Sequence, residues 1–219
     1  LVWDPATEVD ITTADGTDDW VPSLTADATG ALVVAFARNR CPPPDTCYGI
    51  WTTSSTDGVA WTRAAPVIEA GGGLEHHLPA IAQLGGTLTL AWDPYDAAAG
   101  VPWEGLGTGA HISLVTSAPG GWTAPRDVTP REPAAVSAFP TLYADHAGAG
   151  HVAWLAASAT GQAVVERPLA ALDQSPAPLP IDGYSPRIVA TPTLGIYLAA
   201  WVAGPGPDHQ IAVRVFARP

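Results

Sequence analysis

Three consecutive residues, Glu75, His76 and His77, carry side chains that can exchange protons or bind a divalent metal ion. A histidine changes charge near neutral pH and is a common metal ligand. Adjacent residues of an extended segment point to opposite sides, so the two histidines are not expected to bind one metal ion as a pair. In one interpretation, one of them works with Asp18 or Asp19 as a metal ligand or an acid–base group. In the other, both are solvated loop residues.

A second group is acidic and consists of Asp15, Asp18 and Asp19. Carboxylate oxygens suit Ca²⁺, although the spacing differs from that of an EF-hand loop. The alternative is ordinary turn chemistry, because Asp-Gly, as at Asp15 and Gly16, is common in turns. We expect no cofactor other than such a Ca²⁺ ion or an ion in an axial channel.

Two tryptophans, Trp20 and Trp103, are candidates for ligand stacking, because a flat aromatic ring can cover a sugar or a peptide side chain. Tyr184 is expected near them. Arg187 stands where related segments of the chain have uncharged residues, and a buried cation requires a partner. That partner is either a carboxylate of the protein, in a structural ion pair, or a bound anion or carboxylate ligand.

The elements that position these residues come from a fourfold internal repeat. Each copy opens with the pattern x-Pro-x-Leu or x-Pro-x-Ile, where x is any residue. An aromatic residue within an apolar run follows the proline by 13 to 15 residues. A repeat length of roughly 45 to 60 residues indicates one supersecondary unit used four times. The prolines and their aromatic residues are Pro22 with Phe36, Pro79 with Trp92, Pro140 with Trp154, and Pro186 with Trp201.

Within each repeat, short apolar runs alternate with turns rich in Gly, Pro and Asp, which indicates strands. We therefore predict an all-β protein, a four-bladed β-propeller in one domain of residues 1–219. The last repeat has three predicted strands, and Trp3 leads Val9 by the six residues seen from Trp61 to Val67. The N-terminal segment is therefore predicted to close the last blade. A β-sandwich is the alternative. The predicted blades are 21–70, 77–130, 138–182, and 184–219 with 1–12.

In this topology the loops before each first strand and after each second strand share one face of the ring, where function is expected. That face collects Glu75, His76, His77, the acidic group, both candidate tryptophans and Tyr184. The first strands themselves are predicted to begin at or just after the prolines, for example at Ser23 in the first repeat.

Composition limits the partners. The 219 residues carry a net charge of −12, and all nine basic residues are arginine. Such a surface disfavours nucleic acid and anionic membranes, and no apolar run is long enough for a membrane span. Cys41 and Cys47 are separated by five residues, three of them proline, which favours a local disulfide over a zinc site. We therefore expect a secreted or periplasmic protein, of bacterial origin, that is a monomer or one domain of a larger protein.

The segment from Ser55 to Trp61 resembles the Asp-box of sialidase-like (BNR-repeat) propellers, Ser-x-Asp-x-Gly-x-x-Trp, with one residue fewer between Asp57 and Trp61. The resemblance implies a β-propeller in which this hairpin is a folding device. Sialidases of that family usually have six blades and an arginine triad that holds the substrate carboxylate. Only Arg187 stands in a comparable position, and no triad is visible, so sialidase activity is not expected.

These features give three hypotheses for function. The first is a non-catalytic recognition module, without catalytic residues, that binds a glycan or an extracellular protein on the shared loop face. The second is a glycoside-active enzyme that uses two carboxylates from Asp18, Asp19, Glu75 and Asp93, which must face each other about 5 to 10 Å apart. The third is a structural domain of a larger extracellular protein.

Overall fold

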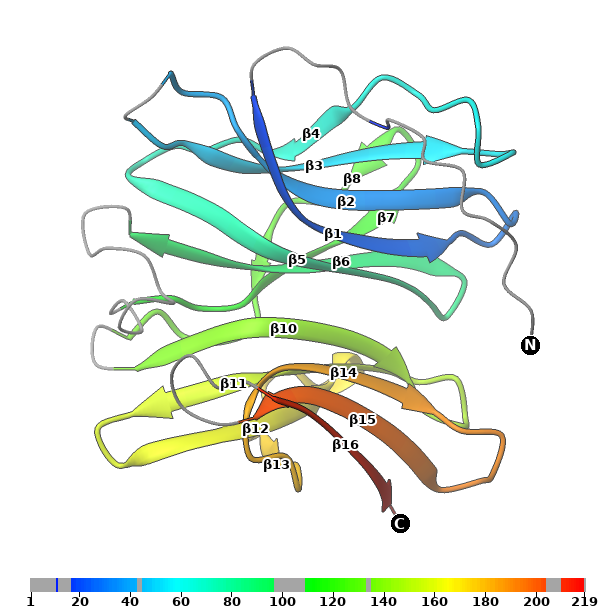
Figure 1. Ribbon diagram of the computed structural model, residues 1–219, viewed down its shortest axis with the longest axis vertical. Coiled ribbons are helices and arrows are strands. Elements are labelled where there is room, and N and C mark those ends of the chain that lie inside the picture. The colour runs from blue at the N-terminus through cyan, green and yellow to red at the C-terminus, as the bar shows by residue number, and fades with distance from the viewer. Residues whose placement is uncertain are drawn as a thin grey trace.

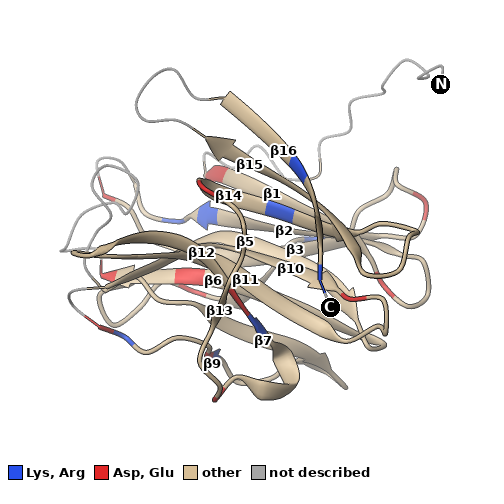
Figure 2. Ribbon diagram, turned by 90° about the horizontal axis from the view of Figure 1, so that it is seen from below, with Lys and Arg blue, Asp and Glu red and all other residues tan. Residues whose placement is uncertain are grey.

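The computed structural model describes residues 11, 17–42, 45–96, 109–132, 135–203 and 210–218. These residues form four antiparallel sheets arranged in a ring, a four-bladed β-propeller, as predicted (Figure 1). Charged residues colour only short parts of the ribbon in Figure 2, because most strand positions are apolar or neutral. Within the described ranges no helix is long and apolar enough to cross a membrane.

The strands of each sheet pair in chain order, except that β8 and β9 of the second sheet both pair with β7. The first contains β1 (Asp18–Ala26), β2 (Leu32–Asn39), β3 (Tyr48–Ser55) and β4 (Ala65–Ile68). The second contains β5 (Leu74–Leu84), β6 (Thr87–Asp96), β7 (Ser113–Ala118), β8 (Gly121–Trp122) and β9 (Arg126–Asp127). The third contains β10 (Val136–Ala144), β11 (Gly150–Ser158), β12 (Gly161–Pro168) and β13 (Ala177–Pro178), with the 3₁₀ helix η3 (Leu169–Ala171) between the last two. The fourth contains β14 (Tyr184–Ala190), β15 (Ile196–Ala203) and β16 (Gln210–Ala217).

The first strands of the sheets begin earlier than the sequence predicts. β1 begins at Asp18 and not at Ser23, and β5 begins at Leu74, so both strands continue through their prolines. Asp18, Glu75 and His77 are consequently strand residues rather than loop residues. A proline cannot donate a backbone hydrogen bond and is therefore uncommon inside a strand, which is why the sequence alone does not indicate these longer strands.

A β-bulge explains how each strand passes its proline. In the first sheet Trp20 pairs with Ala37 and Ser23 with Ala35, so Val21 and Pro22 together oppose the single residue Phe36. The bulge recurs in the other three sheets, and the single opposing residue is the aromatic of each repeat. The opposing residues there are Trp92, Trp154 and Trp201.

The residue before each proline adopts a left-handed backbone conformation, which is rare for residues other than glycine. The φ angles are 50° at Val21, 48° at Leu78, 56° at Phe139 and 53° at Ser185. Among the described residues these four are the complete set of non-glycine residues with positive φ. In three sheets the buried aromatic opposite the bulge packs against the preceding sheet, and these residues are Trp92, Trp154 and Trp201. Phe36 instead packs with Val34 and Trp51 of its own sheet.

Three buried clusters join consecutive sheets. Trp92 and Ile50 lie in the cluster between the first two sheets, Trp154 and Ile112 in the next, and Trp201 and Tyr143 in the last. Predicted closure by 1–12 falls almost entirely outside the described residues and stays a prediction. Ile11, which is described, packs against the first sheet, and β16 pairs only with β15 among the described strands.

Side-chain hydrogen bonds fix the turns at the far end of the strands. Asp57 accepts hydrogen bonds from the backbone N–H groups of Val59 and Ala60, both at 2.8 Å, and these bonds lower its pKa. Gly58 has a φ of 74°, and Trp61 donates through Nε1 to its carbonyl at 3.3 Å. These hydrogen bonds stabilise the turn of this hairpin.

Gly183, which precedes β14, has no room for a side chain. A Cβ atom there would overlap the Val202 carbonyl oxygen and the ring of Trp201. We expect Gly183→Ala to lower the free energy of unfolding by about 2 to 4 kcal/mol, measured by urea denaturation. Gly71→Ala is the matched control, because nothing lies within 4 Å of its Cβ position. Equal stability of the two variants would contradict this packing of the fourth sheet.

Candidate functional site at the channel mouth

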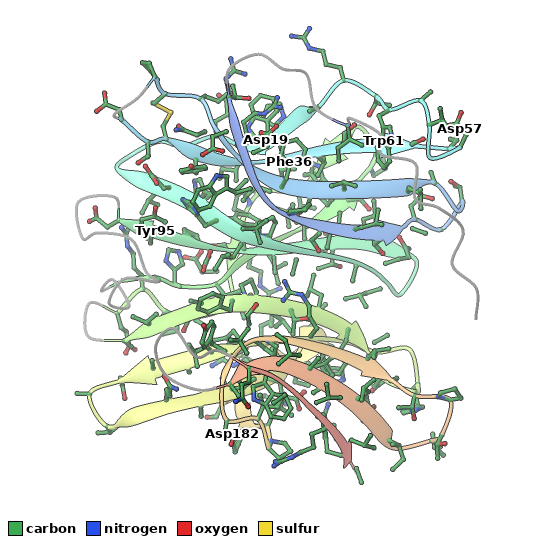
Figure 3. All side chains as sticks on the ribbon, in the orientation of Figure 1. Asp19, Phe36, Asp57, Trp61, Tyr95 and Asp182 are labelled. Carbon is green, nitrogen blue, oxygen red and sulfur yellow. A yellow bond between two sulfur atoms is a disulfide. The ribbon has the colours of Figure 1, made fainter. Side chains whose placement is uncertain are left out.

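The four first strands run in the same direction, so they begin at one end of the ring, which we call the mouth (Figure 1). Tyr95, at the end of β6, lies at this end, whereas the Asp57–Trp61 hairpin lies at the opposite end (Figure 3). Antiparallel pairing also brings the ends of the second strands to the mouth, since Asp18 pairs with Asn39 and Leu74 with Asp96. The mouth is thus the face on which function was predicted.

A buried polar network is centred on Glu75, whose residue is 3% exposed. Its Oε1 accepts a hydrogen bond from the Thr46 hydroxyl at 2.5 Å, and its Oε2 accepts one from the Tyr95 hydroxyl at 2.7 Å. His77 Nε2 lies 3.3 Å from Oε2 and 3.0 Å from the Tyr95 oxygen. Burial lowers the pKa of His77, so the imidazole is held neutral beside the carboxylate.

His76 points away from this network and is used structurally. Its Nδ1 accepts a hydrogen bond from Trp92 Nε1 at 3.0 Å, and the backbone of Glu69 also bonds to the ring. Burial lowers its pKa to about 4, so it is neutral at physiological pH. The opposite orientation of the two histidines follows from strand geometry, as the sequence predicted.

Trp20, Tyr48 and Asp18 form a second group at the mouth, at the edge of the network. The Tyr48 hydroxyl donates to Asp18 Oδ2 at 3.0 Å, and burial raises the pKa of Tyr48 to about 12. The Trp20 and Tyr48 ring centroids are 5.9 Å apart, and those of Tyr48 and His77 are 4.4 Å apart. This group therefore connects the surface at Trp20 with the buried Glu75 network.

Asp19 faces the other side of β1 from Asp18. It forms a bidentate ion pair with Arg38, at 2.6 Å to Nε and 2.7 Å to Nη2. The two aspartates therefore have separate partners, and no group of three possible metal ligands occurs among the residues that the structure describes. Asp15 lies outside those residues, so the Ca²⁺ site stays a prediction.

Asp93 is the most unusual residue near the mouth. It is fully buried, and burial raises its pKa well above the ordinary value. Its Oδ2 lies 3.5 Å from the Phe139 backbone nitrogen, while within the described ranges Oδ1 has no hydrogen-bond partner. An ionised carboxylate is costly in such surroundings, so the neutral acid is favoured.

Three predicted site residues remain, Tyr184, Arg187 and Trp103. Tyr184 begins β14, and its ring lies 5.3 Å from that of Phe139. Arg187 lines the channel below the mouth. Trp103 lies outside the described residues. The predicted Cys41–Cys47 disulfide is present, with the Cα atoms 5.4 Å apart, and it is compatible with an extracellular or periplasmic protein.

Sequence reasoning missed Thr46 and Tyr95, whose hydroxyl groups hold Glu75 in place. Tyr95 has one usable signal, since it lies on the same strand face as Asp93, three residues past the repeat aromatic Trp92. Thr46 has none, because it reaches Glu75 from another blade through the disulfide-bonded loop, a contact 29 residues apart in sequence.

No protein-family model and no curated protein matches the sequence. Solved structures do resemble the fold. A family 117 glycoside hydrolase, Zg3597 from Zobellia galactanivorans, is 14% identical with a TM-score of 0.65, over 94% of this chain and 70% of its own. The Penicillium chrysogenum α-L-arabinanase, complexed with arabinobiose, is 15% identical with a TM-score of 0.65, over 89% and 61%. The NanB sialidase from Streptococcus pneumoniae is 10% identical with a TM-score of 0.63, over 97% and 52%. These similarities establish the fold.

The raised pKa of Asp93 gives a pH-dependent prediction. The folded state favours the neutral acid of Asp93, whereas the unfolded chain has an ordinary carboxyl pKa. The free energy of unfolding therefore declines as pH rises above that ordinary pKa. Asp93→Asn removes this titration. We expect the stability of the variant relative to the native protein to rise by about 1 to 3 kcal/mol between pH 4 and pH 7.5, measured by chemical denaturation at both values. A relative stability that is constant or falls over this range would show that Asp93 is ionised in the native protein.

Proposed function

We propose that the protein is a secreted recognition module that binds a carbohydrate at the channel mouth without cleaving it. The observation that carries the proposal is the exposure of Trp20. Its residue is 41% exposed, and every other aromatic residue in the described part of the chain is buried or half-buried. An exposed ring beside hydrogen-bonding groups is the usual combination for sugar binding, because the ring covers the C–H face and polar groups bind hydroxyls.

Polar groups for this purpose flank the ring. Asp18 is exposed, lies two residues from Trp20 on the same strand face, and its carboxylate accepts hydrogen bonds. The Tyr48 hydroxyl fixes one Asp18 oxygen, so the other is oriented before a ligand arrives. Such preorganisation lowers the entropic cost of binding.

The structural neighbours support a carbohydrate as the ligand by analogy of fold. Of the similar structures, one is a family 117 glycoside hydrolase and another is an arabinanase complexed with arabinobiose. Fold alone does not transfer an activity, so the argument for binding depends on the mouth residues.

The carboxylates favour binding over cleavage. Asp19 is occupied by Arg38, Glu75 is held by Thr46 and Tyr95, and both Glu75 and Asp93 are buried. A hydrolase needs two carboxyl groups that reach the same glycosidic bond from a cleft.

Glycoside hydrolysis is the second candidate, and the raised pKa of Asp93 favours it. Glu75 pairs with Tyr95, and Asp93 lies two residues before Tyr95 on the same face. Such diagonal positions are typically about 7 to 8 Å apart, within the range that glycosidases use. A neutral acid next to a hydrogen-bonded carboxylate is also the usual division of roles between acid and base.

Removal of the Trp20 ring tests the proposed function. A panel of oligosaccharides that includes arabinobiose is first screened for binding to the native protein by calorimetry. For any oligosaccharide that binds, we expect Trp20→Ala to weaken the affinity by about tenfold or more. Trp20→Phe should retain most of the affinity. Val59→Ala is the control, because Val59 is 70% exposed on the far hairpin. A panel with no binder, or binding unaffected by Trp20→Ala, would remove the proposal.

Release of reducing sugar from the same panel separates the two candidates. If the native protein hydrolyses a glycan, Glu75→Gln and Asp93→Asn should each lower the rate by roughly 100-fold or more. Asp173→Asn, at an exposed carboxylate away from the mouth, should leave the rate unchanged. No product from the native protein would exclude hydrolysis of these substrates and leave binding as the function.

A further inference from the structure

Below the mouth, the four first strands line a cavity of about 280 Å³ that is open to solvent. Its volume is below the roughly 300 to 1,000 Å³ typical of pockets for organic ligands. The lining residues are Pro22, Ser23, Leu24, Ala80, Ile81, Thr141, Leu142, Arg187 and Ile188. One of them is charged, and that is Arg187.

Arg187 breaks the repeat symmetry. The residue after the bulge proline is Ser23, Ala80 or Thr141 in the other sheets, so only the fourth sheet contributes a charge to the channel. Arg187 is exposed to solvent, yet the surrounding protein partly desolvates its guanidinium and lowers its pKa. A cation in this position gains from a nearby negative charge.

The protein does not supply that charge from the part that is described. Arg187 Nη1 donates to the carbonyl oxygen of the preceding residue, Pro186, at 2.9 Å. Within the described ranges it forms no ion pair, and the cavity lining contains no Asp or Glu. Of the two partners expected from the sequence, the structural ion pair is therefore absent from these residues.

The other polar side chains of the lining are hydrogen-bond donors. The Ser23 hydroxyl accepts from the Ile81 backbone N–H at 3.1 Å, which leaves its own proton for another acceptor. Thr141 contributes a second hydroxyl residue to the wall. A guanidinium and two hydroxyl side chains, with no carboxylate among the lining residues, complement an anion better than a cation.

We propose that the axial channel binds a small inorganic monoanion, of which chloride is the abundant example, with Arg187 as its charged ligand. The anion neutralises the one charge inside the ring and bridges the fourth sheet to the first and third through Arg187, Ser23 and Thr141. The site does not depend on the proposed carbohydrate binding, because it lies below the mouth and uses none of its residues.

Chloride-dependent stability tests this site. The melting temperature of the native protein should rise by about 4 °C as chloride goes from about 1 mM to about 200 mM, with ionic strength held constant by sodium gluconate. Arg187→Gln should reduce the rise to about 1 °C or less. Arg187→Lys, which keeps the charge without the guanidinium fork, should retain part of it. Arg63→Gln is the matched control, because Arg63 is exposed on the far side of the first sheet and the variant loses the same charge.

The ³⁵Cl NMR linewidth provides a direct readout that does not depend on unfolding. Native protein and Arg63→Gln should broaden the chloride signal, and Arg187→Gln should broaden it at least about threefold less. Equal broadening by Arg187→Gln and native protein, or chloride stabilisation of equal size in both, would overturn the site. Absence of both effects in the native protein would show that the channel holds water.

Discussion

The bulge at each repeat proline is the constraint on which the rest of this structure depends. It places two residues opposite one buried aromatic, and it holds a non-glycine residue at a φ near +50° in all four first strands. Such a conformation costs roughly 1 to 3 kcal/mol at each position and persists only where the surroundings enforce it. The buried aromatic rings supply that enforcement, three of them in clusters between sheets and Phe36 in a cluster within the first sheet.

The bulge also divides each first strand into two functional parts. Residues before the proline, such as Trp20 and His77, belong to the mouth, whereas residues after it, such as Ser23 and Arg187, line the channel. The same unit therefore gives different chemistry in each blade. Where one blade has the exposed Trp20, the next has the neutral His77 beside Glu75, so the mouth is asymmetric although the scaffold repeats.

The sequence was sufficient for the four sheets, because the spacing from Pro22 to Phe36 recurs in every repeat and sheet patterning follows from strand periodicity. It also placed Glu75, Trp20 and Asp18 together at the end of the ring where the first strands begin. It missed the bulge, because the sequence does not show which residues of β1 and β2 pair, and the positive φ at Val21 belongs to that shift in pairing. It missed the Thr46–Glu75 bond because Thr46 lies in a loop of another blade, and such a contact depends on side-chain reach in three dimensions. It missed the Arg38–Asp19 ion pair because these residues face each other across β1 and β2, in a part of β1 that the sequence predicted as loop.

The most direct test of this account is the backbone conformation of the four bulge residues in solution. NMR measurement of the intraresidue NOE between the amide proton and the α-proton distinguishes positive from negative φ, because the two protons approach closely only when φ is positive. The account predicts strong NOEs at Val21, Leu78, Phe139 and Ser185, each stronger than at their extended strand neighbours. Weak NOEs of the extended type at these residues would contradict it, since the division between mouth and channel would then have no structural basis.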